Sequence, residues 1–336
     1  MATTLAPRVL MSAVSQQALA APLADLRRIA PFEVITLAAA RADPTLQVNV
    51  AFISRDITGA STKHQPLADL IDCYAVLRRS PQLRWVHAHS AGADRPIYGE
   101  LRARGVAVST SSGANAPVVA QSALAGLLAL ARRLPALMQA QAACRWAPLQ
   151  QGPALPDLEG QTAVLVGWGP IAQTLQPWLA MLGLRTLVVR RSAVPAAPTG
   201  SKLETLPFTR LEEALPRADW LILACPLTED TWRLIDATAL AQLRPSAMLI
   251  NVARGEVVDE AALIAALNSG GLAGAFLDVF EVEPLPAASP LWQLPGVIVT
   301  PHCAGHADGN AERVAAIFID NLARWLRGEA LVYAAA

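Results

Sequence analysis

The chain has 336 residues, of which 53% are hydrophobic, and its 27 basic residues balance its 27 acidic residues. This length is sufficient for two domains with sizeable cores. A neutral chain offers no electrostatic footprint for nucleic acid or an anionic membrane, so we expect neither partner. The most apolar long run, residues 118–131, is shorter than the roughly 20 residues of a membrane-spanning helix.

The N-terminus and the cysteines predict a compartment. The first residues, MATTLAPRVLMSA, lack a convincing signal-peptide core. The four cysteines (Cys73, Cys144, Cys225 and Cys303) are scattered without the paired spacing of a metal site. We therefore expect reduced thiols, a cytoplasmic protein and no bound metal.

The first 110 residues show a weak α/β pattern. We predict strands at 48–54 and 84–88 and a helix at 67–76. A long helical run follows at 117–143, with a bend expected near Pro135.

From about residue 160 onward, strands alternate with helices. Short apolar runs predict strands at 163–166, 186–189, 220–224, 248–252, 275–279 and 297–300. The clearest helix is 259–269, with Asp259 as its N-cap and Gly270 at its end. This alternation predicts a parallel sheet with helices on both faces. A final amphipathic helix at 311–327 could pack back on the N-terminal part.

The stretch VLVGWGPIAQTL, residues 164–175, resembles a dinucleotide-binding turn. Gly167 permits the tight turn, Gly169 lets a pyrophosphate approach the backbone, and Ala172 lets the helix lie close to the sheet. Other nucleotide and methyl-donor folds use similar turns. Pro177 falls inside the expected helix, where we expect a kink. The turn residues expected to contact the cofactor are Gly167, Trp168, Gly169, Pro170 and Ile171.

Two arginines occupy the position where such folds usually carry an acidic residue for the adenosine ribose. Arg190 and Arg191 offer fixed donors to a phosphate, and Ser192 could add a hydroxyl. We therefore expect NADP(H) to be preferred, with NAD(H) possible. The alternative is that both arginines are ordinary surface charges at a strand end.

Several longer motifs occur in order: SAGAD (90–94), RARGVAVSTSSG (102–113), ARRLP (131–135), CPLTEDT (225–231), NVARGEVVDEAAL (251–263), GAFLDVFEVEPLP (274–286) and PLWQLPGVIVTPHCAG (290–305). Together they resemble the D-isomer-specific 2-hydroxyacid dehydrogenases over roughly residues 80–328. Several motifs in register are far less expected by chance than one glycine turn.

The resemblance implies three catalytic residues: Arg254, Glu283 and His302. Their chemistry suits reduction of a 2-keto acid. Arg254 can hold the substrate carboxylate with two hydrogen bonds, and His302 can give a proton to the carbonyl oxygen. Glu283 can stabilise the protonated imidazole and fix its tautomer. Each also has an ordinary interpretation: a helix cap or a pair with Asp259, a loop surface charge, and a satisfied polar side chain.

The resemblance also implies supporting residues. The backbone of Ala91 and Gly92 would complete the substrate carboxylate site with Arg254 and His302. Further cofactor contacts are expected at Cys225, Pro226, Thr231, Val252, Ala253, Asp278 and His302. Asp278 would lie near the nicotinamide carboxamide.

The remaining histidines and Cys225 have weaker signals. No base is evident beside Cys225, so we do not expect it to be a nucleophile. His306 could touch substrate or lie on the surface. His87 and His89 alternate on a predicted strand without an acidic partner, and we interpret them as structural.

We therefore expect a Rossmann-type doubly wound cofactor domain, residues 112–302, inserted in a smaller flavodoxin-like α/β substrate domain formed by 1–111 and 303–336. The implied activity is reduction of a small 2-keto acid, glyoxylate or hydroxypyruvate, to a D-2-hydroxy acid by a homodimer, with the helix after residue 116 as the contact. The alternatives are a reductase of larger 2-keto acids and a catalytically silent NAD(P)-sensing scaffold. A methyl-donor-binding transferase would leave the downstream motifs unexplained.

Overall fold

The computed structural model describes residues 6–62, 65–149, 154–191 and 203–335. The chain divides into two compact units. Unit 1 comprises residues 1–115 and 307–336, and unit 2 comprises residues 116–306. Each border lies four residues beyond the one expected from sequence (115 against 111, and 306 against 302).

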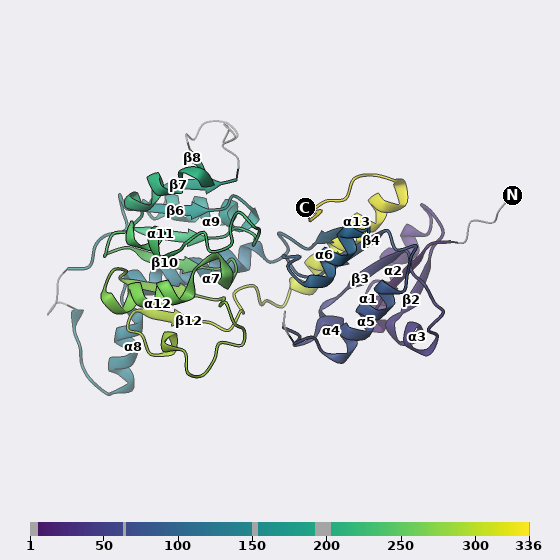
Figure 1. The fold of residues 1–336 in the computed structure, drawn as a ribbon, viewed down its shortest axis with the longest axis horizontal. Coiled ribbons are helices and arrows are strands. Elements are labelled where there is room, and N and C mark those ends of the chain that lie inside the picture. The colour runs from purple at the N-terminus through teal and green to yellow at the C-terminus, as the bar shows by residue number, and fades with distance from the viewer. Residues whose placement is uncertain (1–5, 63–64, 150–153, 192–202, 336) are drawn as a thin grey trace. The chain divides into compact units, whose positions relative to one another are not determined.

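Unit 2 is built on a parallel sheet with the order β12-β11-β10-β9-β6-β7-β8 among the described residues. In Figure 1 the strands run from β8 at the top of this unit to β12 at the bottom. Their bounds are β6 Thr162–Val166, β7 Arg185–Arg190, β8 Glu204–Pro207, β9 Trp220–Leu223, β10 Met248–Asn251, β11 Gly274–Leu277 and β12 Val297–Val299. This is the order of a dinucleotide-binding sheet, whose strand order reverses between β6 and β9.

Alternate residues of the unit 2 strands bury two opposite faces. The helices are α7 Ala116–Ala131, α8 Leu134–Ala142, α9 Pro170–Met181, α10 Leu211–Ala214, α11 Ala237–Ala241 and α12 Glu260–Ser269. Val164 and Val166 of β6 share a core with α10, α11 and α12. Ala163 and Leu165 share the opposite core with α7 and α9. The sheet is therefore wound on both sides, as expected from sequence.

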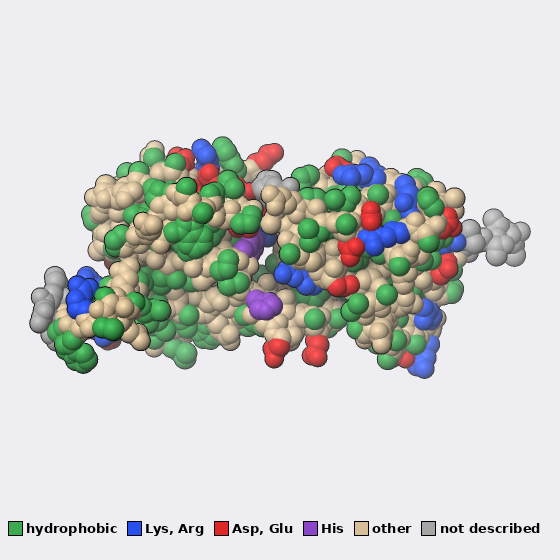
Figure 2. Space-filling view, turned by 90° about the horizontal axis from the view of Figure 1, so that it is seen from below, with side chains coloured by type: hydrophobic (Ala, Val, Ile, Leu, Met, Phe, Trp, Pro, Cys, Tyr) green, Lys and Arg blue, Asp and Glu red, His purple; other side chains and the backbone are tan. Residues whose placement is uncertain are grey.

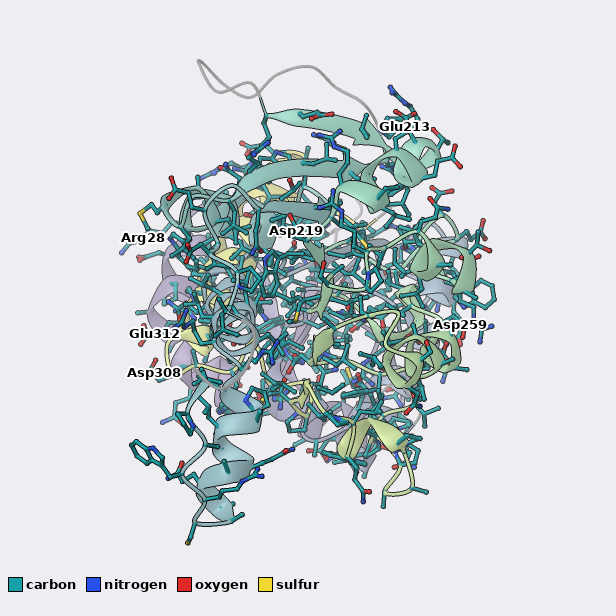
Figure 3. The ribbon with its side chains drawn as sticks, turned by 90° about the vertical axis from the view of Figure 1, so that its left-hand side faces the viewer. Arg28, Glu213, Asp219, Asp259, Asp308 and Glu312 are labelled. Carbon is teal, nitrogen blue, oxygen red and sulfur yellow. The ribbon has the colours of Figure 1, made fainter. Side chains whose placement is uncertain are left out.

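Local chemistry explains most helix ends of unit 2. The Asp259 side chain accepts a hydrogen bond from the Ala262 amide, and Gly270 ends α12 in a left-handed conformation; Figure 3 labels Asp259. The expected run 117–143 is two helices, because the chain turns at Arg133, with φ 52°, before Pro135 enters the first turn of α8.

The expected kink at Pro177 does not end its helix, because α9 continues through this residue to Met181. Pro177 and Gln173 are both exposed. The Gln173 carbonyl, which loses its helical donor at Pro177, therefore lies on the exposed face of α9.

Unit 1 contains a parallel sheet with the order β2-β1-β3-β4-β5 among its described residues. The strands are β1 Arg8–Met11, β2 Glu33–Thr36, β3 Val50–Ile53, β4 Trp85–Ala88 and β5 Ala107–Thr110. This 2-1-3-4-5 order is that of flavodoxin-like folds. The expected fold class, a Rossmann sheet with a second α/β unit, is confirmed.

The helices of unit 1 also cover both faces of its sheet. They are α1 Ala13–Ala18, α2 Ala20–Leu26, α3 Leu37–Ala42, α4 Arg55–Thr58, α5 Ala68–Arg78, α6 Pro96–Ala103 and α13 Asn310–Arg327. Leu10, Ile53 and Val86 pack with α3, α5 and α6. On the other face, Phe318 of α13 stacks on Phe52 of β3 with ring centroids 4.3 Å apart. The C-terminal helix therefore packs on the N-terminal part, as expected.

Acidic and basic side chains are interspersed over the face of the molecule in Figure 2, in keeping with the neutral net charge. Within the described residues, no helix has the length and apolarity needed to cross a bilayer.

Candidate active site

The glycine turn lies at the carboxyl end of β6, where the strand order of unit 2 reverses. Gly167 has φ 99°, and an added Cβ would lie 2.8 Å from both the Ala224 carbonyl oxygen and the Cys225 Cα. Its amide donates to the Val189 carbonyl at 2.7 Å. Both conformation and space therefore require glycine at this position.

The start of α9 suits an anionic group. Gly169 is its N-cap residue, no side chain caps this end in the described structure, and Pro170 occupies the first turn. A Cβ added at Gly169 would meet nothing within 4 Å. The Gln173 amide group donates to the Trp168 carbonyl at 2.9 Å and so fixes the turn. The open backbone at a helix N-terminus fits the pyrophosphate of a dinucleotide, and Ile171 belongs to the same turn.

The two arginines expected to read a 2′-phosphate follow β7. Arg190 is the last residue of the strand and half-buried, and Arg191 is exposed. Neither guanidinium makes a hydrogen bond or ion pair with the part of the chain that the structure describes. Ser192 lies outside the described residues.

Residues after β9 form a tight loop. Burial raises the pKa of the Cys225 thiol to about 12, so it stays protonated and is no nucleophile at neutral pH. The Thr231 hydroxyl donates to the Pro226 carbonyl at 2.7 Å and accepts from the Thr228 amide at 2.8 Å. Thr231 therefore shapes this loop through its side chain. After β10, Val252 and Ala253 are buried.

Arg254 is fixed through its backbone by Asn251. The Asn251 side chain accepts from the Ala253 amide and donates to the Arg254 carbonyl, each at 3.0 Å. The Arg254 guanidinium donates to the Ala253 carbonyl at 2.7 Å. Because the motif was interpreted through its arginine, the role of Asn251 was not foreseen. The spacing in NVARG could have suggested it, since Asn commonly bonds the backbone two residues on.

Gly255 brings two segments of unit 2 into direct backbone contact. A Cβ at this position would lie 1.8 Å from the Phe280 carbonyl carbon and 2.3 Å from the Glu281 nitrogen. Only a glycine allows the chain after Arg254 to pass so close to the loop that carries Glu283.

Glu283 connects this loop to His302. One carboxylate oxygen accepts from the Phe280 amide at 3.1 Å, and the other lies 2.7 Å from His302 Nδ1. Burial alone would raise the pKa of Glu283. The hydrogen bond and charge of His302, the Phe280 amide and the charge of Arg254 outweigh it and lower the pKa. The Glu283 side chain is therefore an ionised partner of the imidazole at neutral pH.

His302 lies in a strained turn that Asp278 organises. The backbone of His302 is left-handed, with φ 51°, and its amide donates to the Asp278 carbonyl at 2.8 Å. The buried Asp278 carboxylate accepts from the Thr300 hydroxyl at 2.6 Å and from the amides of Cys303 and Ala304 at 2.9 and 3.0 Å. Burial raises the pKa of Asp278, and these donors oppose that rise.

Asp278 was expected to contact the nicotinamide, and no described contact tests that role. The structure shows a different use for its carboxylate, as the acceptor that holds the turn around His302. Local sequence contains no signal for this contact, because the partners are more than 20 residues apart.

The structure thus brings Arg254, Glu283 and His302 together within unit 2. The charge of Arg254 also lowers the pKa of Cys225 against the larger effect of burial, which places the guanidinium near the end of β9. Half of the His302 side chain is exposed (49%). His306 is also exposed.

Ala91 and Gly92 lie in unit 1, in the turn that follows β4. The Ser90 hydroxyl donates to the Gly92 carbonyl at 2.7 Å, and the Ser111 amide donates to the Ser90 carbonyl at 3.0 Å. The described residues contain no group of three His, Cys, Asp or Glu side chains suited to a metal ion.

Comparisons with known proteins agree with this arrangement. Residues 124–304 match the family model of the D-isomer specific 2-hydroxyacid dehydrogenase, NAD binding domain. The chain is 38% identical to an (S)-sulfolactate dehydrogenase of Chromohalobacter salexigens, over 75% of this chain and 80% of that protein. It is 35% identical to a glyoxylate reductase of Thermococcus gammatolerans, over 76% of each chain.

A similar fold occurs in a D-isomer specific 2-hydroxyacid dehydrogenase from Xanthobacter autotrophicus, solved in complex with NADPH and MES. That structure is 30% identical, covers 98% of both chains and superposes with a TM-score of 0.75.

Proposed function

Because the chain belongs to the D-isomer specific 2-hydroxyacid dehydrogenases, we propose that it reduces a small 2-keto acid to a D-2-hydroxy acid with NADPH. Glyoxylate and hydroxypyruvate are the first substrates to test. The observation that carries the proposal is the 2.7 Å contact between His302 Nδ1 and Glu283, beside the charge of Arg254. A cation, an ionised carboxylate and an exposed imidazole are the groups that this reduction needs.

Arg254 binds the substrate carboxylate in this proposal. Its planar guanidinium can donate two parallel hydrogen bonds, which orient the keto group as well as attract the charge. Asn251 fixes the backbone that carries this side chain. The amides of Ala91 and Gly92 are the further donors proposed for the same carboxylate.

His302 supplies the proton. Its Nδ1 faces Glu283, so Nε2 is the nitrogen that gives a proton to the carbonyl oxygen of the keto acid. Glu283 stays ionised, holds the imidazole in one orientation and stabilises its protonated form. The nicotinamide cofactor supplies the hydride when bound. In the reverse direction, Nε2 accepts the proton of the hydroxy acid.

The residues proposed to hold the cofactor lie at the carboxyl edge of the unit 2 sheet. The start of α9 would take the pyrophosphate. Arg190 and Arg191 would bind the 2′-phosphate of NADPH, a preference of roughly 2–4 kcal/mol for charge-assisted hydrogen bonds.

An assay with both cofactors tests this proposal. With glyoxylate or hydroxypyruvate, the purified protein should oxidise NADPH faster than NADH. The Arg190→Asp variant should reduce the NADPH-to-NADH ratio of kcat/KM by about tenfold or more. Arg185→Asp is the matched control, because Arg185 begins the same strand at its opposite end and is exposed. An unchanged ratio in Arg190→Asp would remove the phosphate role.

We also propose a homodimer in the cytoplasm. The α7–α8 region and the segment after it expose apolar side chains: Leu134 at 43%, Met138 at 65% and Trp146 at 90%. A second copy of the chain would cover them, and the four free cysteines suit a reducing compartment. Light scattering should give the mass of a dimer, and Met138→Glu should shift it toward the monomer. A monomeric wild-type protein would contradict this assembly.

A further inference from the structure

The carboxyl edge of the unit 1 sheet gathers polar groups that the proposed reaction does not use. β3 and β4 are neighbours with Ile53 opposite Ala88, and the His89 amide donates to the Ile53 carbonyl at 3.0 Å. Ser54 and His89 therefore follow the ends of adjacent strands, and the turn of Ala91 and Gly92 comes next. Ligands of open α/β sheets bind at this edge.

Ser54 is buried without a hydrogen-bond partner. Its exposed fraction is 4%, and its Oγ contacts no acceptor or donor among the described residues. A buried hydroxyl normally has a partner, so an unpaired one at a ligand-binding edge points to a ligand.

The surroundings of this hydroxyl are electrically positive. Arg55 is exposed and makes no ion pair or hydrogen bond with any described residue. Arg95 is fixed, because its guanidinium donates to the carbonyls of Ser61 and Thr62 at 2.8 and 2.7 Å.

His89 reports the resulting field. Burial first, and then the charges of Arg55 and Arg95, lower the pKa of His89 to about 4, while the charge of Asp56 acts in the opposite direction. The imidazole is therefore neutral at pH 7, and the positive potential that opposes its protonation would stabilise an anion.

We propose that Ser54, Arg55 and His89 form a subsite for an anionic group, and that the substrate is a 2-keto acid with a second acidic group on C3. That group is a carboxylate or a sulfonate. Arg55 supplies the charge and two donors, while Ser54 and His89 supply neutral hydrogen bonds. The inference of a substrate rests on the proposed reductase function, whereas the anion subsite itself does not.

Binding of product-like hydroxy acids tests the subsite separately from catalysis. Calorimetry on the full-length protein with NADP⁺ would compare malate and sulfolactate, which carry two acidic groups, with glycolate, which carries one. We expect the doubly acidic ligands to bind about tenfold more tightly or better. Malate against sulfolactate identifies the preferred acidic group.

The Arg55→Gln variant should reduce the ratio of doubly acidic to glycolate affinity by about tenfold. Arg28→Gln is the matched control, because Arg28 is an exposed arginine of the same unit that pairs only with Asp25 among the described residues (Figure 3). Ser54→Ala should reduce the same ratio by a smaller factor without lowering the thermal midpoint, because the hydroxyl has no partner to lose.

Two outcomes would overturn the inference: glycolate binding as tightly as the doubly acidic ligands, or Arg55→Gln leaving the affinity ratio unchanged. Selective binding of doubly acidic ligands without turnover of any 2-keto acid would support the subsite and refute the proposed function. Turnover of glyoxylate without such selectivity would do the reverse.

Discussion

Two histidines at the carboxyl ends of parallel strands have opposite environments. His87, in unit 1, is fully buried, and both ring nitrogens contact serines: Ser109 at 2.7 Å and Ser111 at 3.0 Å. His302, in unit 2, is half-exposed and contacts a carboxylate through one nitrogen only. The same side chain is therefore part of a core in one unit and part of a reactive site in the other.

The hydrogen bonds around His87 fix its tautomer. The Ser109 hydroxyl accepts from Trp85 Nε1 at 2.8 Å, so it gives its own proton to His87 Nδ1. His87 Nε2 then donates to Ser111, whose hydroxyl donates to the Ala88 carbonyl at 3.1 Å. No site remains for a second proton. The comparison teaches that residue type alone does not indicate an acid–base role; a free nitrogen and a charged partner do.

Replacing His302 should have the largest effect. His302→Ala removes the proposed proton donor, so kcat should fall by about 10²–10⁴-fold, while the affinity for NADPH stays near that of the wild type. Steady-state kinetics and cofactor fluorescence titration measure the two quantities. Glu283→Gln should fall between this variant and the wild type, because it keeps a hydrogen bond but loses the charge. Near-normal turnover of His302→Ala would exclude His302 from the mechanism.

Replacing His87 should act on stability instead. His87→Ala leaves Ser109 and Ser111 buried without the imidazole, so the free energy of unfolding should fall by about 2–3 kcal/mol. Denaturant titration measures this change. Because His87 is remote from proton transfer in our proposal, kcat at 25 °C should remain close to the wild-type value. A large loss of kcat in a folded variant would contradict the assignment of His87 to the core.

The pH dependence of stability sharpens the same comparison. Burial lowers the pKa of His87 from 6.5 to about 3. Below pH 6.5 the unfolded chain gains a proton that the folded chain refuses, so stability is complete above pH 6.5 and declines as pH falls toward 3. At pH 5 the loss from this group is about 2 kcal/mol.

His87→Gln provides the control for this pH effect, since it keeps hydrogen-bonding groups without a titration in this range. His89, whose pKa is also lowered, contributes a similar slope that remains in both proteins. Equal slopes for the wild type and His87→Gln would show that His87 titrates normally in the folded state.

Periodicity and capping predicted much of unit 2. The six strands expected there are β6, β7, β9, β10, β11 and β12, with ends shifted by no more than two residues. Asp259 was expected to cap its helix, and its side chain accepts the Ala262 amide. These signals are local, and buried parallel strands give continuous apolar runs that are easily recognised.

Other parts gave no usable local signal. β1, β2 and β5 have only four residues each, and β8 is an edge strand with a charged residue and a proline. The roles of Asp278 and Ser111 depend on partners more than 20 residues away. Periodicity within a short window cannot report such contacts, because they arise only when the sheet is assembled.

The absence of a side chain at position 255 has a mechanical consequence. With the Phe280 carbonyl carbon 1.8 Å from where a Cβ would stand, the segments bearing the guanidinium and the acidic partner of the imidazole abut main chain to main chain. Any rearrangement during turnover must carry both together. The separation between cation and carboxylate is thus dictated by peptide planes, which yield far less than rotatable side chains do.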